Sequence, residues 1–199
     1  MIQEAAWHKI KWILGILIVC LGVLHTVRLN VIEIQKGNTM PQTIEASKLR
    51  NVTYFTDFSL ETMEGGSFGS ADLPDYTVTV FNVWEPYCSS CLAEMPELDE
   101  LAQELKDRGI RLVIVNGDAY ESPEDVELSI SQIRQMNIRM TSLLADEQFT
   151  KEVRPILNDA FPGTFVVDSQ GNILDFAAGS KSKDAWREYL LQFCGETDQ

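Results

Sequence analysis

Two cysteines separated by two residues are the part of this chain best suited to chemistry. Cys88-Ser89-Ser90-Cys91 follows an uncharged apolar run and opens a stretch with helical periodicity. At the start of a helix, backbone N–H groups and the helix dipole stabilise an anion, so Cys88 is predicted to be the more acidic, nucleophilic thiol. Cys91 lies almost one turn further along the same face, where it can attack a mixed disulfide formed at Cys88. The spacing therefore predicts a redox-active dithiol.

Three other interpretations of this pair stay open. A structural zinc site needs about four ligands, whereas the chain after residue 30 offers Cys88, Cys91 and a distant Cys194 and contains no histidine. We therefore predict no metal and no other cofactor. A purely structural disulfide would close a loop too small to constrain the unfolded chain much. The pair could also be incidental core cysteines, and Cys194 is predicted to be a buried, unreactive thiol.

Strand and helix patterns alternate around the pair. The β-branched and aromatic run of residues 76–84 predicts a strand buried on both faces, and apolar residues at helical spacing from Leu92 to Leu105 predict the helix that follows. Residues 53–73 predict a strand or hairpin that enters the domain. The further predicted elements are strands at 110–115, 165–167 and 173–177 and helices at 126–136 and from Ser182 onward. This alternation predicts an α/β fold in which helices cover both faces of a mixed central sheet.

The first 30 residues form a different kind of segment. They hold three cationic residues and one acidic residue, which gives them a net charge of +2. Because the whole chain has a net charge of −14, the residues after position 30 carry −16. Residues 12–24 are apolar without interruption, and the span extends to 10–27 when polar residues near the headgroups are included. We predict one uncleaved transmembrane signal anchor here. A cleaved signal peptide and a buried helix are the alternatives. Cys20 is then a membrane-embedded apolar residue or an acylation site.

The length and composition of the chain indicate that the residues after the predicted anchor form one globular domain. The chain has 199 residues and a mass of 22.4 kDa, with 45% hydrophobic and 23% charged residues, which is typical of globular proteins. Four cysteines are too few for a disulfide-dense secreted scaffold. The acidic balance argues against nucleic-acid binding, which needs a basic surface. We expect a tether over residues 31–52 and a monomeric globular domain over residues 53–199.

Two separated motifs resemble one known family. Residues 81–98, FNVWEPYCSSCLAEMPEL, are similar to the active-site stretch of extracytoplasmic thioredoxin-like thiol-disulfide oxidoreductases of the TlpA and ResA type. That family shows a strand, then Trp-x-x-Trp-Cys-x-x-Cys and Glu-x-Pro. Residues 161–168, FPGTFVVD, resemble its later segment, which carries a cis-proline facing the cysteines. The positions of the first motif that match are Trp84, Cys88, Cys91, Glu94 and Pro96.

The resemblance implies a thioredoxin-like fold and gives roles to several residues. Cys88 and Cys91 become the catalytic pair. Glu94 becomes a partly buried carboxylate whose pKa, raised by desolvation, lets it take the Cys91 proton, with an ordinary surface Glu as the alternative. Pro162 is implied to be cis, which exposes the backbone at Phe161 to an extended substrate segment. The residues predicted for the substrate-docking surface are Trp84, Tyr87, Phe161 and Pro162.

The chain departs from the family pattern just before the first cysteine. Tyr87 replaces the usual Trp, and Glu85-Pro86 replaces two small residues. A carboxylate close to Cys88 would oppose thiolate formation and raise the pKa of that thiol, whereas a solvated loop Glu85 would have little effect. For Trp84, core packing is the alternative to a docking role.

The resemblance and the predicted anchor together imply a single-pass membrane protein whose extracytoplasmic domain, in the periplasm or on the outer face of the membrane, reduces disulfides in exported proteins. Family substrates include apocytochrome c before haem attachment and oxidised proteins awaiting repair. Net reduction implies a membrane protein as the electron donor. The alternatives are a disulfide-forming oxidase or isomerase, a metallochaperone and a redox-inactive binding module. The two-residue spacer and the lack of histidine after residue 30 argue against a metallochaperone.

Overall fold

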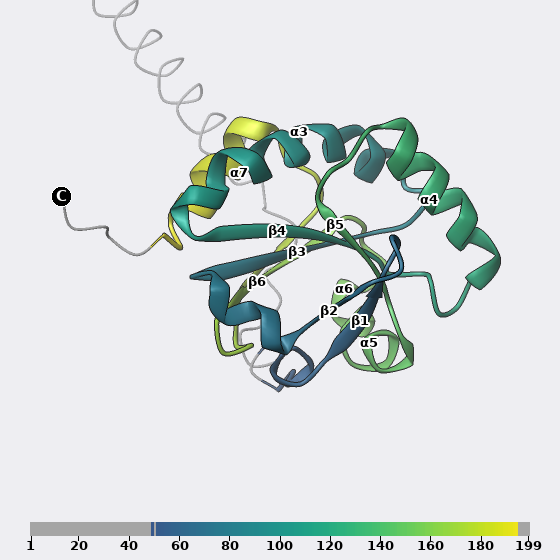
Figure 1. Ribbon diagram of the computed structural model, residues 1–199, viewed down its shortest axis with the longest axis horizontal. Coiled ribbons are helices and arrows are strands. Elements are labelled where there is room, and N and C mark those ends of the chain that lie inside the picture. Colours follow the sequence, from purple (N-terminus) through teal and green to yellow (C-terminus); the bar gives the residue numbers. More distant parts are fainter. Residues whose placement is uncertain (1–48, 50, 195–199) are drawn as a thin grey trace, which may run out of the picture. The chain divides into compact units, whose positions relative to one another are not determined.

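A seven-stranded mixed sheet runs through the part of the chain that the computed structural model describes, residue 49 and residues 51–194 (Figure 1). The strand order is β2-β1-β5-β4-β3-β6-β7. β3, β4 and β5 are parallel, and every other neighbouring pair is antiparallel. The strands are β1 (Ser59–Thr62), β2 (Ser67–Gly69), β3 (Val78–Trp84), β4 (Ile110–Asn116), β5 (Thr141–Leu144), β6 (Gly163–Asp168) and β7 (Ile173–Ala178).

Helices cover both faces of this sheet, as the sequence predicts. Figure 1 shows α3 (Ser89–Leu105), α4 (Val126–Gln135) and α7 (Lys183–Leu191) on one face, and α5 (Glu147–Glu152) and α6 (Arg154–Leu157) on the other. Short 3-10 helices complete the connections. They are η1 (Tyr54–Thr56), η2 (Ser70–Asp75), η3 (Lys106–Arg108) and η4 (Pro123–Asp125). The predicted α/β architecture with a mixed sheet is confirmed.

The central strand β3 is buried along its whole length, so its side chains serve two cores. Because successive residues of a strand point to opposite faces, Val80 and Trp84 join the core beneath α3 and α7, while Phe81 and Val83 join the core on the other face. In the second core Phe55 stacks on Phe81 at 4.6 Å between ring centroids. Truncating a buried ring of this kind to Ala costs about 3–5 kcal/mol, so the sheet that carries the cysteine helix is firmly held.

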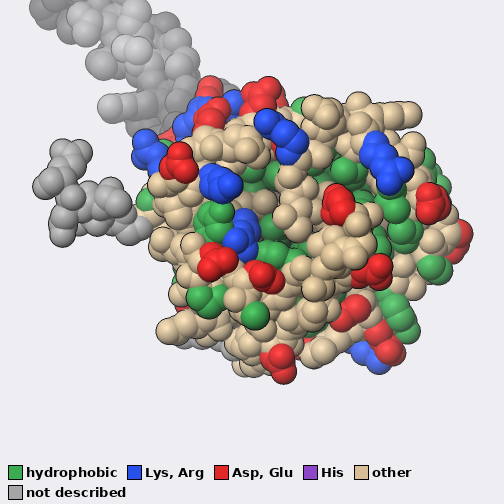
Figure 2. Space-filling model, in the orientation of Figure 1, with side chains coloured by type: hydrophobic (Ala, Val, Ile, Leu, Met, Phe, Trp, Pro, Cys, Tyr) green, Lys and Arg blue, Asp and Glu red, His purple; other side chains and the backbone are tan. Residues whose placement is uncertain are grey.

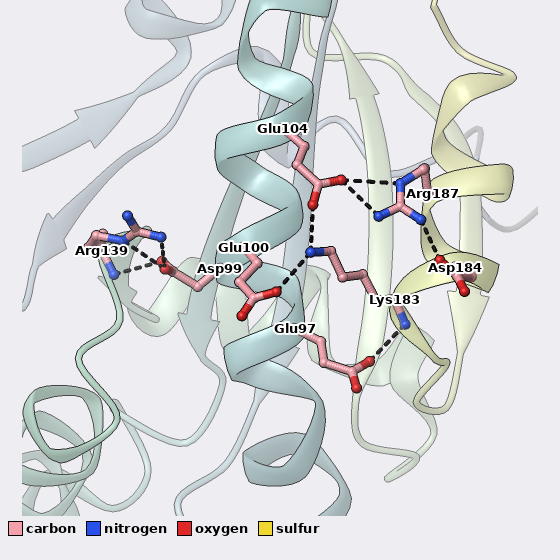
Figure 3. Close-up of polar contacts among 8 residues, drawn as sticks. All are labelled: Glu97, Asp99, Glu100, Glu104, Arg139, Lys183, Asp184 and Arg187. Atoms are coloured by element: carbon pink, nitrogen blue, oxygen red, sulfur yellow. Dashed lines mark hydrogen bonds and ion pairs between the residues drawn. The ribbon is translucent and has the colours of Figure 1, made fainter.

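Helix α7 lies against α3 through two buried side chains, Trp186 and Leu190, and an outer row of ion pairs. Trp186 is fully buried in the core that α3 also lines. In Figure 3, Lys183 and Arg187 reach from α7 to acidic residues of α3: Lys183 Nζ lies 2.8 Å from Glu100 Oε2, and Arg187 Nη2 lies 2.8 Å from Glu104 Oε2. Solvent-exposed pairs of this type contribute about 0–1 kcal/mol each. The buried indole therefore holds α7 in place more than the ion pairs do.

Three elements have no counterpart among the predicted ones. β5 has four residues, α5 six and α6 four, and segments of this length are too short to show a hydrophobic period. Asp146, which the sequence analysis does not identify, caps the start of α5, because its side chain accepts a hydrogen bond from the N–H of Phe149 at 2.7 Å. α6 places Arg154 in contact with carboxylates from two loops, those of Glu85, Asp118 and Glu121.

Two residues before residue 53 contact the core of the globular domain. Leu49 and Val52, which the sequence assigns to the tether, pack against the aromatic core. The predicted anchor at residues 10–27 and most of the predicted tether lie outside the described residues. Within residues 49 and 51–194, no helix combines the length and the hydrophobicity needed to cross a membrane.

Candidate active site

Helix α3 begins at the cysteine pair because Cys88 caps it. The backbone of Cys88 is extended, and its sulfur accepts a hydrogen bond from the N–H of Cys91 at 3.2 Å. The structure joins the two residues in a disulfide with their Cα atoms 5.3 Å apart. Cys91 is 1% exposed, whereas Cys88 is half-buried. Cys88 is therefore the sulfur that an incoming thiol or disulfide can reach.

The first turn of α3 provides a favourable environment for a thiolate at Cys88. The N–H of Cys91 donates to the sulfur, and this turn carries no acidic residue. The Oγ atom of Ser90 lies 3.4 Å from the Cys88 sulfur, close enough to donate a hydrogen bond to it. A helix N-terminus stabilises a negative charge by about 0.3–1 kcal/mol when exposed. The local geometry thus favours Cys88 over Cys91 as the nucleophile.

Glu94, on the second turn of α3, is buried and accepts three hydrogen bonds. One carboxylate oxygen accepts from Asn82 Nδ2 at 3.1 Å. The other accepts from the backbone N–H of Lys181 at 3.0 Å and from Trp186 Nε1 at 3.1 Å. Burial raises the pKa of Glu94 above the ordinary glutamate value, and the three donors oppose that shift because they stabilise the carboxylate. The structure gives Glu94 the buried position that the resemblance implies.

Asn82 and Thr164 are two residues of this network that the sequence analysis does not identify. Both are buried, and Asn82 Nδ2 also donates to Thr164 Oγ1 at 3.0 Å. A single amide in the uncharged apolar run of β3 is a signal that could have identified Asn82, because a buried amide needs hydrogen-bond partners. Thr164 carries no such signal, since threonine is common in strands. Asn82 links Glu94 to the strand that follows Pro162.

The peptide bond between Phe161 and Pro162 is cis, as the resemblance implies. Pro162 is buried at the start of β6, and its carbonyl accepts a hydrogen bond from the N–H of Gly179 at 2.8 Å. Phe161 is half-buried and packs against the core cluster that contains Cys91. Its ring also lies against Gly117, where a Cβ atom would sit 3.3 Å from a ring carbon. Phe161 therefore lies between the loop that follows β4 and the core on which Cys91 packs.

The prediction that Trp84 belongs to the docking surface is wrong. Trp84 is the last residue of β3, and its side chain points to the face that α3 covers, where it is fully buried. It continues the inward-facing row of that strand and contributes to the core instead. Tyr87, in contrast, is 72% exposed, and its hydroxyl donates to Asp125 Oδ1 at 2.8 Å. Tyr87 and the exposed part of Phe161 are the predicted docking residues that a substrate can contact.

Glu85 is not a freely solvated loop residue. Its side chain is 23% exposed and lies 3.4 Å from Arg154 Nη2. Burial and the charge of Asp118 raise the pKa of Glu85, and the guanidinium of Arg154 opposes that shift. The carbonyl of Glu85 accepts a hydrogen bond from the N–H of Cys88 at 3.1 Å. Glu85 is thus part of the loop that carries the nucleophile.

Among the described residues, no group of three or more His, Cys, Asp or Glu is arranged to hold a metal ion. A cavity of about 330 Å³, bordered by Arg111 and Thr141, lies toward the other end of β4, away from Cys88. On the face drawn in Figure 2, basic and acidic side chains are interspersed. Cys194 is a half-buried free thiol, and Cys20 lies outside the described residues.

Comparison with known proteins identifies the family. Residues 53–176 match the AhpC/TSA family. The chain belongs to the AhpC/TSA family. Among its relatives, the thioredoxin-like protein YneN of Bacillus subtilis is 25% identical over 186 residues, which cover 90% of this chain and 96% of YneN. The thiol-disulfide oxidoreductase ResA of Bacillus cereus is 23% identical over 135 residues, 67% of this chain and 73% of ResA. The thiol:disulfide interchange protein DsbE of Yersinia pestis is 29% identical over 67% of each chain.

Solved structures place this AhpC/TSA chain in the thioredoxin-like fold. A thioredoxin-family thiol:disulfide interchange protein from Chlorobium tepidum superimposes with a TM-score of 0.60 at 21% identity, over 73% of this chain and 98% of that one. StoA from Bacillus subtilis superimposes with a TM-score of 0.54 at 18% identity, over 69% and 98%. The resemblance to the TlpA and ResA type is therefore confirmed.

Proposed function

We propose that this protein is a membrane-anchored, extracytoplasmic thiol-disulfide oxidoreductase that reduces disulfides in exported proteins through Cys88 and Cys91. The observation that carries the proposal is the disulfide at the N-terminus of α3, with one sulfur half-buried and the other buried. The relatives named as thiol-disulfide oxidoreductases support the exchange chemistry and protein substrates that contain disulfides.

In the reduced protein, the Cys88 thiolate attacks one sulfur of a substrate disulfide. A mixed disulfide forms, and the other substrate sulfur leaves as a thiolate. Glu94 accepts the proton of Cys91, whose thiolate then attacks the Cys88 sulfur and expels the second substrate thiolate. The substrate gains two electrons, and the protein is left with the Cys88–Cys91 disulfide. A membrane protein carrying a dithiol would restore the reduced state.

Net reduction is supported by the charges close to Cys88. Three carboxylates, those of Glu85, Asp118 and Glu121, pair with the single guanidinium of Arg154 in the loops beside the disulfide. This excess of negative charge opposes thiolate formation. A strongly oxidising pair needs a well-stabilised reduced form, and the carboxylates work against it.

The extracytoplasmic location is supported by residues 1–30. Their net charge of +2 and apolar core suit an anchor whose N-terminus stays in the cytoplasm. The similarity to YneN covers 90% of the chain, more than the residues from 49 onward could supply, so it extends into the segment before the globular domain. The donor and the exported substrates would then meet the acidic domain outside the cytoplasm.

The reduction potential of the full-length protein in detergent tests the proposal. We expect a two-electron transition near or below the ~−270 mV of thioredoxin when the protein is equilibrated with thiol buffers. A value near the ~−120 mV of a strong oxidant would reverse the proposed electron flow. Cys88→Ser should abolish the transition and Cys194→Ser should keep it. A wild-type protein without any transition would leave a binding module as the better interpretation.

A further inference from the structure

Arg154, the first residue of α6, reaches two loops that flank the disulfide. Its Nη2 atom lies 3.4 Å from Glu85 Oε1, three residues before Cys88. Its Nη1 atom lies 3.1 Å from Asp118 Oδ1, in the loop after β4, and also contacts the Glu121 carboxylate. The side chains of Arg154 and Asp118 are each 20% exposed, so these pairs are less screened by solvent than ordinary surface pairs.

Both loops lie at the redox site. The carbonyl of Glu85 accepts the hydrogen bond of the Cys88 N–H, and the side of Gly117 faces the ring of Phe161. Helix α6 itself ends at Leu157 and leads within a few residues to the cis bond before Pro162. One guanidinium therefore connects the approach to the nucleophile, the loop behind the docking residue and the helix that leads to the cis-proline.

The guanidinium is also outnumbered by acidic groups. Three carboxylates contact it, and Asp159 is close enough to raise the pKa of Glu85. Without Arg154, four carboxylates would lie near a sulfur that must itself become an anion. Each unit charge at a distance of ~10 Å shifts such an equilibrium measurably when solvent screening is incomplete.

We propose that Arg154 is a positioning residue for thiol–disulfide exchange. It holds the loop of Glu85 and the loop of Asp118 beside the disulfide, and it offsets carboxylate charge that would otherwise disfavour the Cys88 thiolate. The inference rests on the redox role proposed for Cys88. It adds a residue that stands outside both sequence motifs.

Other titratable groups around the disulfide are accounted for. Lys181, the other cation in these loops, interacts with Glu94 and Trp186. Its backbone N–H donates to Glu94, and its ammonium lies 5.2 Å from the Trp186 ring centroid. The titratable and charged groups in the loops that adjoin the disulfide, with the one on the first two turns of α3, are Glu85 and Tyr87 before α3, Glu94 on α3, Asp118, Tyr120 and Glu121 after β4, Glu124 and Asp125 before α4, Arg154 and Asp159 on and after α6, and Lys181 before α7.

The test is the pH dependence of Cys88 alkylation in the reduced full-length protein. Iodoacetamide reacts with the thiolate, and peptide mapping separates Cys88 from the other cysteines. In Arg154→Gln we expect the midpoint of the rate profile to rise, with about threefold to tenfold less thiolate at a given pH below the midpoint. Adding Glu85→Gln to Arg154→Gln should move the midpoint back toward that of wild type, which a merely structural role would not predict.

Arg187→Gln is the matched control, because Arg187, on α7, also pairs with more than one carboxylate, those of Glu104 on α3 and Asp184 on α7. Its midpoint should equal that of wild type. If Arg154→Gln does not fold, Glu85→Gln alone should lower the midpoint. Unchanged midpoints in Arg154→Gln or in Glu85→Gln would overturn the inference. A wild-type protein that lacks a two-electron transition would instead reject the proposed function.

Discussion

At the scale of single residues, burial and hydrogen bonding shift the pKa of Glu94 in opposite directions. Its three contacts all come from N–H donors, an arrangement that satisfies a carboxylate and offers no acceptor to a protonated acid. Burial nevertheless raises its pKa, because the charged form loses its hydration. This balance leaves Glu94 able to hold a proton at a higher pH than an ordinary glutamate can, as a proton acceptor for Cys91 requires.

Replacing Glu94 by Gln should make stability less dependent on pH. Because the folded-state pKa is raised, the folded protein binds a proton before the unfolded chain does as the pH falls. The stability of wild type relative to Glu94→Gln should therefore rise as the pH falls toward ~4.3, and be lost as the pH rises through the folded pKa. The change is about 1.4 kcal/mol for each unit by which the pKa is raised. Urea unfolding of both oxidised proteins between about pH 5 and about pH 8 measures it.

The control for this comparison is Glu97→Gln, which removes an exposed carboxylate from the same helix. It corrects for the general effect of taking one negative charge from α3. A difference in the free energy of unfolding between wild type and Glu94→Gln that stays constant across the pH range would contradict the assignment of a raised pKa.

In single-turnover assays we also expect Glu94→Gln to release the mixed disulfide about 100-fold more slowly, since proton transfer typically contributes at least that factor.

At the scale of elements, the turn between β6 and β7 is pressed against η1. Gly171 (φ +87°) and Gly65 (φ +85°) both have left-handed backbone, so Ala is strained at either position by about 1–2 kcal/mol. At Gly171 a Cβ atom would also lie 2.6 Å from the carbonyl carbon of Phe55, whereas at Gly65 nothing lies within 4 Å. We expect Gly171→Ala to lose about 3 kcal/mol or more and Gly65→Ala about 1 kcal/mol. If the two variants have equal unfolding midpoints in urea, η1 moves aside for the added Cβ atom at little cost, and the prediction is wrong.

The elements that long periodic patterns specify were predictable, and those fixed by tertiary contacts were not. The apolar run that becomes β3 and the spaced leucines of α3 place Cys88 at a strand-to-helix junction from sequence alone. The buried indole of Trp84 was not predictable, because an aromatic residue before a cysteine pair suits a core and a docking surface equally well. Arg154 gave no signal, since its importance depends on loops distant in sequence that meet only in the folded chain.

At the scale of the whole molecule, the two parts of the chain differ in charge and in hydropathy. A segment with a net charge of +2 and an apolar core precedes a body with −16. Positive residues beside a first span favour retention of that end in the cytoplasm. The body would then lie outside the cytoplasm, in an environment where substrate disulfides persist. The proposed direction of electron flow depends on this location, because reducing equivalents must cross the membrane to reach the Cys88–Cys91 disulfide.

Interrupting the apolar segment should therefore detach the protein from the membrane. In Ile16→Lys/Val19→Lys, two charges lie near the centre of the predicted span, and each adds about 2.5–3.5 kcal/mol to the cost of insertion. The matched variant Ile32→Lys/Ile34→Lys makes the same changes in the predicted tether and should stay membrane-bound. Alkaline extraction of isolated membranes distinguishes the two.

In intact cells, a membrane-impermeant maleimide should label reduced Cys88 of wild type, since only an extracytoplasmic thiol is within its reach. Labelling that appears only after lysis would place the dithiol in the cytoplasm and contradict the proposed donor arrangement.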